Sequence, residues 1–276
     1  MKKHILLPTD FSDNAWSAAV YALKLFAHEE CRFYFLHSTK MHISTMSNMT
    51  NKLLDHMSKA ALKDLNELKE MAEHTNVNAN HEFDIILSAD NLEDAMSMAI
   101  AKHHIDLVVM GTKGSTGAKE IFFGSNTVRI IKKTKQCPLL VVPDDFDFAI
   151  PSQIAFPTDF TRDYADRELK YLRSLIELYD SKIRIVCILS KDKLTGVQEY
   201  NMTMLESYLE DYDYSFHFMP NYAKKTEEIN DFIEMLEVNM LAMVNYKHSF
   251  IESIVKEPVI KKIGFHPIVP FYVIPD

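Results

Sequence analysis

Few features limit the fold of this chain as strongly as a cluster of glycines behind an apolar run. The chain has only six glycines, and four of them fall within residues 110–127, namely Gly111, Gly114, Gly117 and Gly124. Residues 105–110, which precede them, are typical of a buried strand. Glycines at a strand end leave backbone N–H groups unobstructed by a Cβ atom. The cluster predicts a strand that ends in an anion-binding loop, although glycines that serve only as turn residues would give the same pattern.

A helix is predicted directly after this loop. Residues 124–127, Gly-Ser-Asn-Thr, open a helical segment that extends to about residue 134. A helix N-terminus offers free N–H groups and the positive end of the helix dipole, and the hydroxyls of Ser125 and Thr127 would lie beside them. A phosphate chain is the natural ligand for such donors. Ser and Thr also favour helix starts, and a capping role is compatible with a phosphate role.

Strands and helices alternate along the first half of the chain. Five apolar runs predict strands at residues 4–8, 32–37, 83–87, 105–110 and 138–143. This alternation is typical of a doubly wound α/β fold, a parallel sheet with helices on both faces, which binds ligands at the carboxyl ends of its strands. Asp10 and Gly111 each follow a predicted strand, so we expect both at this edge. Asp10 would either contact a ligand or brace the turn before the first helix.

The composition is that of an ordinary soluble globular protein. With 276 residues, 47% apolar and 25% charged, the chain is long enough for two domains. A net charge of −9 argues against a broad nucleic-acid surface. The cysteines Cys31, Cys137 and Cys187 are widely spaced and predict buried thiols in a reducing compartment. No apolar run approaches the roughly 18 residues of a membrane span, so we expect a cytoplasmic protein without a membrane partner.

The sequence pattern of the first half returns in the second half. Residues 8–12, Pro-Thr-Asp-Phe-Ser, recur as residues 157–161, Pro-Thr-Asp-Phe-Thr, and a run that resembles residues 138–143 closes the chain. The repeat predicts two domains, residues 1–146 and 147–276. The second copy lacks the glycines, and Lys256, Glu257 and Pro258 stand where Gly124 and Ser125 would recur. Because these side chains would obstruct or repel a phosphate, a second phosphate site is not expected.

Several familiar catalytic and metal-binding motifs do not occur. The chain has no Gly-x4-Gly-Lys-(Ser/Thr) loop, no Gly-x-Ser-x-Gly elbow, no Cys-x-x-Cys and no His-Glu-x-x-His. Its twelve histidines do not show the spacing of metal ligands. No residue is therefore assigned a catalytic role, and metal binding by protein ligands alone is not expected.

Taken together, these motifs resemble those of the universal stress protein (UspA) family. Pro-Thr-Asp-Phe-Ser follows the first strand, and Gly111, Gly114, Gly124 and Ser125 match the family motif Gly-x2-Gly-x9-Gly-(Ser/Thr) without a gap. The first half resembles the family over its full length, whereas the second half is similar in layout but degenerate. The chain thus resembles a tandem two-domain member of the family.

The resemblance implies a fold, a ligand and a set of contacts. Each domain would contain a five-stranded parallel sheet of order 3-2-1-4-5, as in adenine nucleotide alpha hydrolase-like folds. The ligand would be ATP, and Mg²⁺ could accompany it. The implied ligand contacts are Pro8, Asp10, Ser38, Met110, Gly111, Gly114, Gly124, Ser125, Asn126 and Thr127. Asn126 departs from the aliphatic residue that is usual in the family, but a backbone contact would survive this change. Family members pair through their fifth strands, which implies a homodimer and an internal pseudo-dimer of the two halves.

The sequence therefore predicts an ATP-binding regulatory protein of stress-response type, with the nucleotide in the first domain. Two alternatives remain open at this point. One is a structural or dimerisation protein whose nucleotide sites are vestigial. The other is a slow ATPase, for which Asp10 is the candidate carboxylate.

Overall fold

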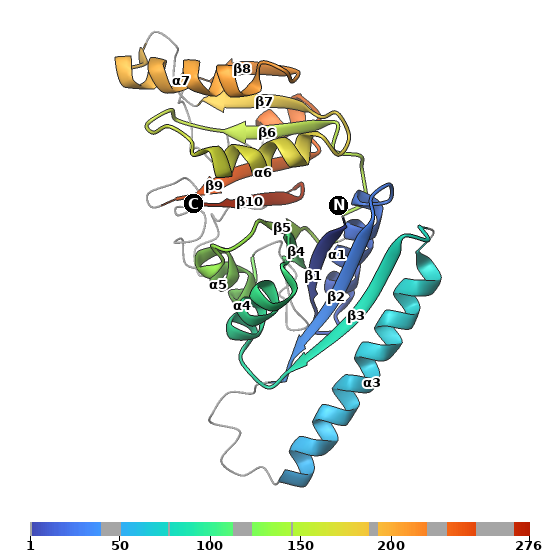
Figure 1. Cartoon of the computed structure of the whole chain (residues 1–276). Coiled ribbons are helices and arrows are strands. Elements are labelled where there is room, and N and C mark those ends of the chain that lie inside the picture. The colour runs from blue at the N-terminus through green and yellow to red at the C-terminus, as the bar shows by residue number, and fades with distance from the viewer. Residues whose placement is uncertain are drawn as a thin grey trace. The chain divides into compact units, whose positions relative to one another are not determined.

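The computed structural model describes residues 2–39, 51–76, 78–112, 123–144, 146–187, 193–219, 231–246 and 268–276. The chain forms two compact units, Met1–Asp147 and Phe148–Asp276, here called unit 1 and unit 2 (Figure 1). Both units are α/β, and every strand pairing given within them is parallel.

Unit 1 contains a five-stranded sheet. Its strands and helices follow one another as β1 (Lys3–Pro8), α1 (Asp13–Leu25), β2 (Cys31–Ser38), α3 (Asn51–Thr75), β3 (His81–Ser88), α4 (Leu92–His103), β4 (Leu107–Gly111), α5 (Ser125–Lys133) and β5 (Leu139–Val142). The strand order is β3-β2-β1-β4-β5, which confirms the predicted order 3-2-1-4-5. Helices α1 and α3 cover one face and α4 and α5 cover the other, as right-handed crossovers require (Figure 1).

Local sequence explains where these elements begin. Ser12 caps α1 by accepting a hydrogen bond from the backbone N–H of Ala15 at 3.3 Å. Asn91 caps α4 in the same way through the N–H of Asp94 at 2.9 Å. The predicted fourth strand was too long at its start, because Asp106 uses its carboxylate to accept the backbone N–H of His4 and lies before β4.

Unit 2 repeats the topology of unit 1. Its elements are β6 (Gln153–Pro157), α6 (Asp166–Ile176), β7 (Lys182–Cys187), α7 (Gly196–Leu209), β8 (Tyr214–Phe218), β9 (Met240–Asn245) and β10 (Phe271–Pro275). Read from β8, its strand order is β8-β7-β6-β9-β10, so the repeated sequence pattern corresponds to a repeated fold. Helix α7 has 14 residues where α3 has 25, which places part of the shortening of the second copy in its second helix.

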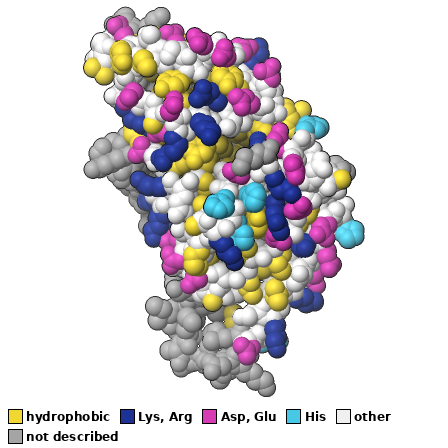
Figure 2. Space-filling view, viewed as in Figure 1, with side chains coloured by type: hydrophobic (Ala, Val, Ile, Leu, Met, Phe, Trp, Pro, Cys, Tyr) yellow, Lys and Arg dark blue, Asp and Glu magenta, His cyan; other side chains and the backbone are white. Residues whose placement is uncertain are grey.

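The sheets form the cores, and the surface is mixed in charge. All three cysteines are buried free thiols, as predicted, and burial raises the pKa of Cys31 and of Cys137 to about 12. On the face shown in Figure 2, Lys and Arg side chains lie interspersed with Asp and Glu side chains. Among the described residues, no helix combines the length and the apolar character needed to cross a membrane.

Candidate functional site

The carboxyl ends of β1 and β4 meet the first turn of α1 at one edge of unit 1. Gly111 is the last residue of β4, and Asn14 of α1 lies directly against it. A Cβ atom at position 111 would lie 2.1 Å from Asn14 Oδ1 and 2.6 Å from Asn14 Cγ. Gly111 is therefore required for the close approach of α1 to β4, whatever it does for a ligand.

The base of the loop between β4 and α5 is closed by hydrogen bonds. The N–H of Gly124 donates to the carbonyl oxygen of Thr112 at 2.6 Å. The hydroxyl of Thr127, which is 2% exposed, lies 3.2 Å from the carbonyl oxygen of Gly111 and 3.1 Å from that of Thr112 and donates to both. Since these bonds occupy the Thr127 hydroxyl, the group that Thr127 can offer to a ligand is its backbone N–H.

Helix α5 begins without a side-chain cap. Its N-cap is Gly124, at φ −61° and ψ 156°, which has no side chain to bind the N–H groups of Ser125, Asn126 and Thr127. These are the first three amides of the helix, and the side chains of Ser125 and Asn126 are exposed. Beside this turn, Thr112 is fully buried, and its hydroxyl has no hydrogen-bond partner in the described part of the chain. The backbone N–H groups of Ser125 and Asn126 can donate to a phosphate oxygen at this turn, whereas the buried Thr112 hydroxyl is not accessible to one.

Asp10 lies at the same edge, in the turn between β1 and α1. Its Oδ1 accepts the backbone N–H of Ser12 at 3.2 Å and the hydroxyl of Ser12 at 2.6 Å. The intervening Phe11 has a φ of 64°, a left-handed conformation that a bulky residue rarely adopts, and its N–H donates to Thr9 Oγ1 at 3.0 Å. Asp10 thus supports this turn, and its side chain remains exposed.

Unit 2 repeats this turn in detail. Asp159 Oδ1 accepts the backbone N–H of Thr161 at 3.1 Å and its hydroxyl at 2.7 Å, and Phe160 has a φ of 55°. Because unit 2 lacks the glycines, the repeated hydrogen bonds indicate that this aspartate has a structural role that does not depend on a nucleotide.

The remaining predicted contacts fall into two groups. Pro8 and Met110 are buried at the carboxyl ends of β1 and β4, and Ser38 ends β2 with its hydroxyl donating to the carbonyl oxygen of Asp90 at 2.5 Å. All three lie at the carboxyl edge of the sheet. Gly114, by contrast, falls in residues 113–122, outside the described residues. The residues that would replace the phosphate loop in the second copy, 256–258, also fall outside them.

Asn14 was not among the residues predicted to lie at this edge. Asn14 is 5% exposed and stands two residues after the N-cap of a helix whose inward positions are otherwise apolar. A polar residue among inward-facing apolar positions is a signal that the sequence offers. It indicates a specific polar contact, because buried polar side chains usually have a partner.

At the carboxyl edge of unit 2, the described residues form a cluster around Arg162. The guanidinium carbon of Arg162 lies 4.3 Å from the ring centre of Tyr246 and 5.2 Å from that of Tyr164. Arg162 also pairs with Glu168, which is 1% exposed, and the Tyr164 hydroxyl donates to Thr158 Oγ1 at 2.7 Å. Burial raises the pKa of both tyrosines, so both phenols remain neutral at physiological pH. Unit 1 has Phe11 and Asp13 at the positions of Phe160 and Arg162, so this cluster is specific to unit 2.

A cavity of about 650 Å³ opens at the opposite, amino-terminal edge of unit 1, where α3 ends and β3 begins. The polar groups that line it already contact one another. His81 Nδ1 lies 2.6 Å from Asn76 Oδ1, and Asn78 Nδ2 donates to the carbonyl oxygens of Ala27 and Glu29. The cavity therefore has fewer free donors for a phosphate than the first turn of α5.

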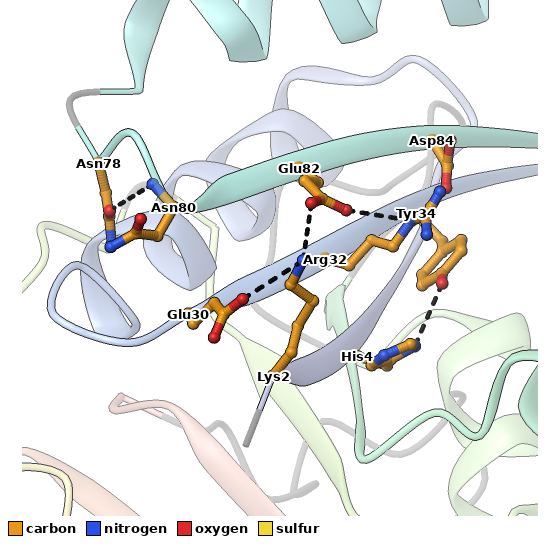
Figure 3. A network of polar contacts seen from close by, with 9 residues as sticks. All are labelled: Lys2, His4, Glu30, Arg32, Tyr34, Asn78, Asn80, Glu82 and Asp84. Atoms are coloured by element: carbon orange, nitrogen blue, oxygen red, sulfur yellow. Dashed lines mark hydrogen bonds and ion pairs between the residues drawn. The ribbon is translucent and has the colours of Figure 1, made fainter.

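Exposed ion pairs border this cavity (Figure 3). Lys2 Nζ lies 3.4 Å from Glu30 and 2.7 Å from Glu82, and Arg32 Nε lies 2.6 Å from Asp84. These side chains are substantially exposed, and exposed pairs contribute little to stability. With three carboxylates for two cations, the network does not offer an excess of positive charge to a phosphate.

The described residues do not contain a group of three or more His, Cys, Asp or Glu side chains that could hold a metal ion. Near the α5 turn, Asp10 is the predicted carboxylate, and its Oδ1 is engaged by Ser12. The arrangement can thus bind an anion through backbone donors, while a base positioned for chemistry is not evident among the described residues.

Comparisons with known proteins agree with this architecture. The universal stress protein family matches residues 1–143. Universal stress protein MJ0531 of Methanocaldococcus jannaschii is 31% identical over 146 residues, which cover 51% of this chain and 81% of that protein. Universal stress protein MJ0577 of the same organism is 27% identical over 159 residues, which cover 51% of this chain and 95% of that protein.

Solved structures extend the likeness to both units. A universal stress protein from Archaeoglobus fulgidus superposes with a TM-score of 0.70 at 18% identity, covering 99% of this chain and 96% of that one. A functionally unknown protein from Pseudomonas aeruginosa superposes with a TM-score of 0.57 at 11% identity, covering 99% of this chain and 92% of that one. At these identities the likeness concerns the fold.

Proposed function

The chain belongs to the universal stress protein family, and on that premise we propose that unit 1 binds one adenine nucleotide, ATP, at the edge formed by β1, β4 and α5. The proposed contacts are Pro8, Asp10, Ser38, Met110, Gly111, Gly114, Gly124, Ser125, Asn126 and Thr127. The phosphates would lie on the first turn of α5, and the nucleoside would lie over the ends of β1, β2 and β4. Mg²⁺ could accompany the phosphates, with phosphate oxygens and water supplying most of its ligands.

The observation that carries this proposal is the uncapped start of α5. Gly124 leaves three helix amides without a capping side chain. The first N–H groups of a helix have no partner within the helix and lie at the positive end of its dipole, so they favour an anion. A bound phosphate would supply acceptor oxygens to these amides.

The role that follows is regulatory. The proposed site holds a nucleotide through backbone groups and lacks an evident base among the described residues, which suits a protein that senses ATP in a stress response in the cytoplasm. The absence of the motif glycines from the second half of the sequence supports a stoichiometry of one nucleotide per chain. A homodimer is proposed from the family resemblance.

Two observations favour a second candidate, a structural or dimerisation protein with a vestigial site. Asn14 alone explains why residue 111 is glycine, and the Asp10 turn recurs in unit 2, where the glycines of the motif are absent. Both features are therefore explained without a ligand. The uncapped turn of α5 supports the first candidate, because it leaves backbone N–H groups for a ligand.

Equilibrium dialysis with ATP tests the proposal through a matched pair of glycine variants. Gly124→Glu places a carboxylate on the proposed phosphate position, and the negative φ of Gly124 accepts a side chain without strain. Gly196→Glu is the control, since a Cβ atom at this position in the first turn of α7 meets nothing within 4 Å. We expect saturable binding by the wild type and by Gly196→Glu, and loss of binding in a folded Gly124→Glu variant.

The opposite outcome would support the second candidate. A wild-type protein that binds no ATP, or a Gly124→Glu variant that binds as tightly as the control, would contradict nucleotide binding at α5. Release of phosphate from bound ATP that disappears in Asp10→Ala would instead identify a slow ATPase.

A further inference from the structure

Arg129 lies one turn into α5 and is drawn back toward the start of the helix. Its Nη2 donates to Asn126 Oδ1 at 2.5 Å, and its Nε lies 3.2 Å from Glu93 Oε1 in the first turn of α4. Side chains on a helix lean toward its N-terminus, so a guanidinium four residues after Ser125 can reach the first turn. The two contacts hold the guanidinium against the side chain of Asn126, in the first turn of α5.

Arg129 shares one carboxylate with a second cation. Glu93 is only 16% exposed in its side chain and pairs with both Arg129 and Lys133. Lys133 lies at the far end of the nine-residue helix, so of these two cations Arg129 is the nearer to the first turn. The planar guanidinium also has further N–H donors that can bind phosphate oxygens.

We propose that Arg129, positioned by Asn126 and Glu93, makes the α5 site selective for nucleotides with a longer phosphate chain, ATP and ADP over AMP. This inference rests on the proposed function and deepens it. The amides of the first turn contact the phosphate nearest to them in every adenine nucleotide. A cation to one side of that turn adds attraction that grows with the number of charged phosphates. Asn126, expected from the sequence to act through its backbone, thereby acquires a side-chain role in positioning Arg129.

Isothermal titration with ATP, ADP and AMP at low salt tests this selectivity. Arg129→Gln removes the cation and keeps a hydrogen-bonding side chain. Lys133→Gln removes the same charge from the other partner of Glu93, farther from the first turn, and is the matched control. We expect the ratio of ATP to AMP affinity to fall by about two- to fivefold in Arg129→Gln and to stay unchanged in Lys133→Gln. The difference should shrink at high salt, because exposed charges are screened.

A third variant tests the positioning role. Asn126→Val keeps the charge of Arg129 but removes the acceptor that draws it toward the first turn. We expect the ATP-to-AMP ratio to fall in this variant, but less than in Arg129→Gln. An unchanged ratio in Asn126→Val would overturn the role of Asn126, because the charge alone would then suffice.

Failure of this inference can be distinguished from failure of the proposed function. If the wild type binds ATP and Arg129→Gln keeps the wild-type ratio, the selectivity role of Arg129 is overturned and the nucleotide site remains. An equal fall in Arg129→Gln and Lys133→Gln would overturn it as well, because a general charge effect would explain both. If the wild type binds none of the three nucleotides, the proposed function and this inference fall together.

Discussion

Gly111 and Asn14 lie so close together that a Cβ atom at position 111 would come within 2.1 Å of Asn14 Oδ1. This contact joins the end of β4 to the first turn of α1 in unit 1. It shows that the first glycine of the family motif has a packing role of its own. Gly111 alone therefore does not indicate a nucleotide site. The observation that supports one lies at the other end of the loop, where Gly124 is the N-cap of α5.

Gly111→Ala should destabilise unit 1. The added methyl group would displace Asn14 or shift α1, and overpacking of this kind typically costs about 1–3 kcal/mol. Gly196→Ala is the control, because its Cβ atom meets nothing within 4 Å and replacing glycine reduces the entropy of the unfolded chain. Thermal unfolding should show a lower midpoint for Gly111→Ala and an unchanged or slightly higher one for Gly196→Ala. Equal midpoints for the two variants would contradict the packing role.

Thr127→Val should weaken the base of the loop. The substitution preserves shape but removes the hydroxyl that donates to the carbonyl oxygens of Gly111 and Thr112. Leaving buried acceptors with fewer donors costs roughly 1–3 kcal/mol, and chemical denaturation would measure this loss. Thr127→Ser, which keeps the hydroxyl, should lose less. If Thr127→Val is as stable as the wild type, the hydroxyl does not close the loop.

Asp10→Ala and Asp159→Ala should cost unit 1 and unit 2 similar amounts of stability. Each aspartate accepts the same pair of hydrogen bonds from the Ser or Thr two residues later, at nearly the same distances. We expect a loss of about 1 kcal/mol for each variant. The ATP affinity of both variants is then measured by equilibrium dialysis. The amount by which Asp10→Ala binds ATP more weakly than Asp159→Ala is the contribution of Asp10 to ATP binding. A large stability loss in one variant alone would contradict the shared structural role.

Stability should fall as the pH drops below the ordinary pKa of histidine. Burial lowers the pKa of His81 from 6.5, although the carbonyl groups of Phe26 and Glu29 partly oppose this shift. Because the unfolded chain then binds the proton more readily than the folded one, His81 contributes stability above pH 6.5 that is lost as the pH falls through its folded pKa.

Urea denaturation between about pH 7 and pH 5.5 would measure this dependence. The free energy of unfolding should decrease over this range in the wild type and in His28→Gln, whose side chain is exposed. The decrease should be smaller in His81→Gln. A slope in His81→Gln equal to that of the wild type would show that His81 does not cause it.

Much of the fold could be predicted from the sequence, because local patterns determine it. Alternating apolar runs and helical segments gave the doubly wound topology, and Ser12 was correctly expected to cap α1. The recurrence of residues 8–12 at residues 157–161 identified the repeat, and both copies form the same turn. These features depend on residues that are close together in the chain.

The parts of the site that escaped prediction depend on contacts between distant residues. Asn14 meets Gly111 across almost a hundred positions, and Glu93 of α4 meets Arg129 of α5. Spacing rules describe a single helix or strand and do not report which side chains meet across the sheet edge. For the same reason, the sequence indicated a free hydroxyl at Thr127, whereas the structure shows it donating to two carbonyl groups.

A crystal structure of the protein soaked with ATP would show whether the uncapped first turn of α5 in unit 1 binds the phosphates of one nucleotide. We expect phosphate density within hydrogen-bonding distance of the backbone N–H groups of Ser125 and Asn126. The corresponding edge of unit 2 should hold Arg162 between Tyr164 and Tyr246, without nucleotide. A structure in which neighbouring side chains cover the α5 turn and exclude ATP would contradict this expectation. Nucleotide density found only at other positions would contradict it as well.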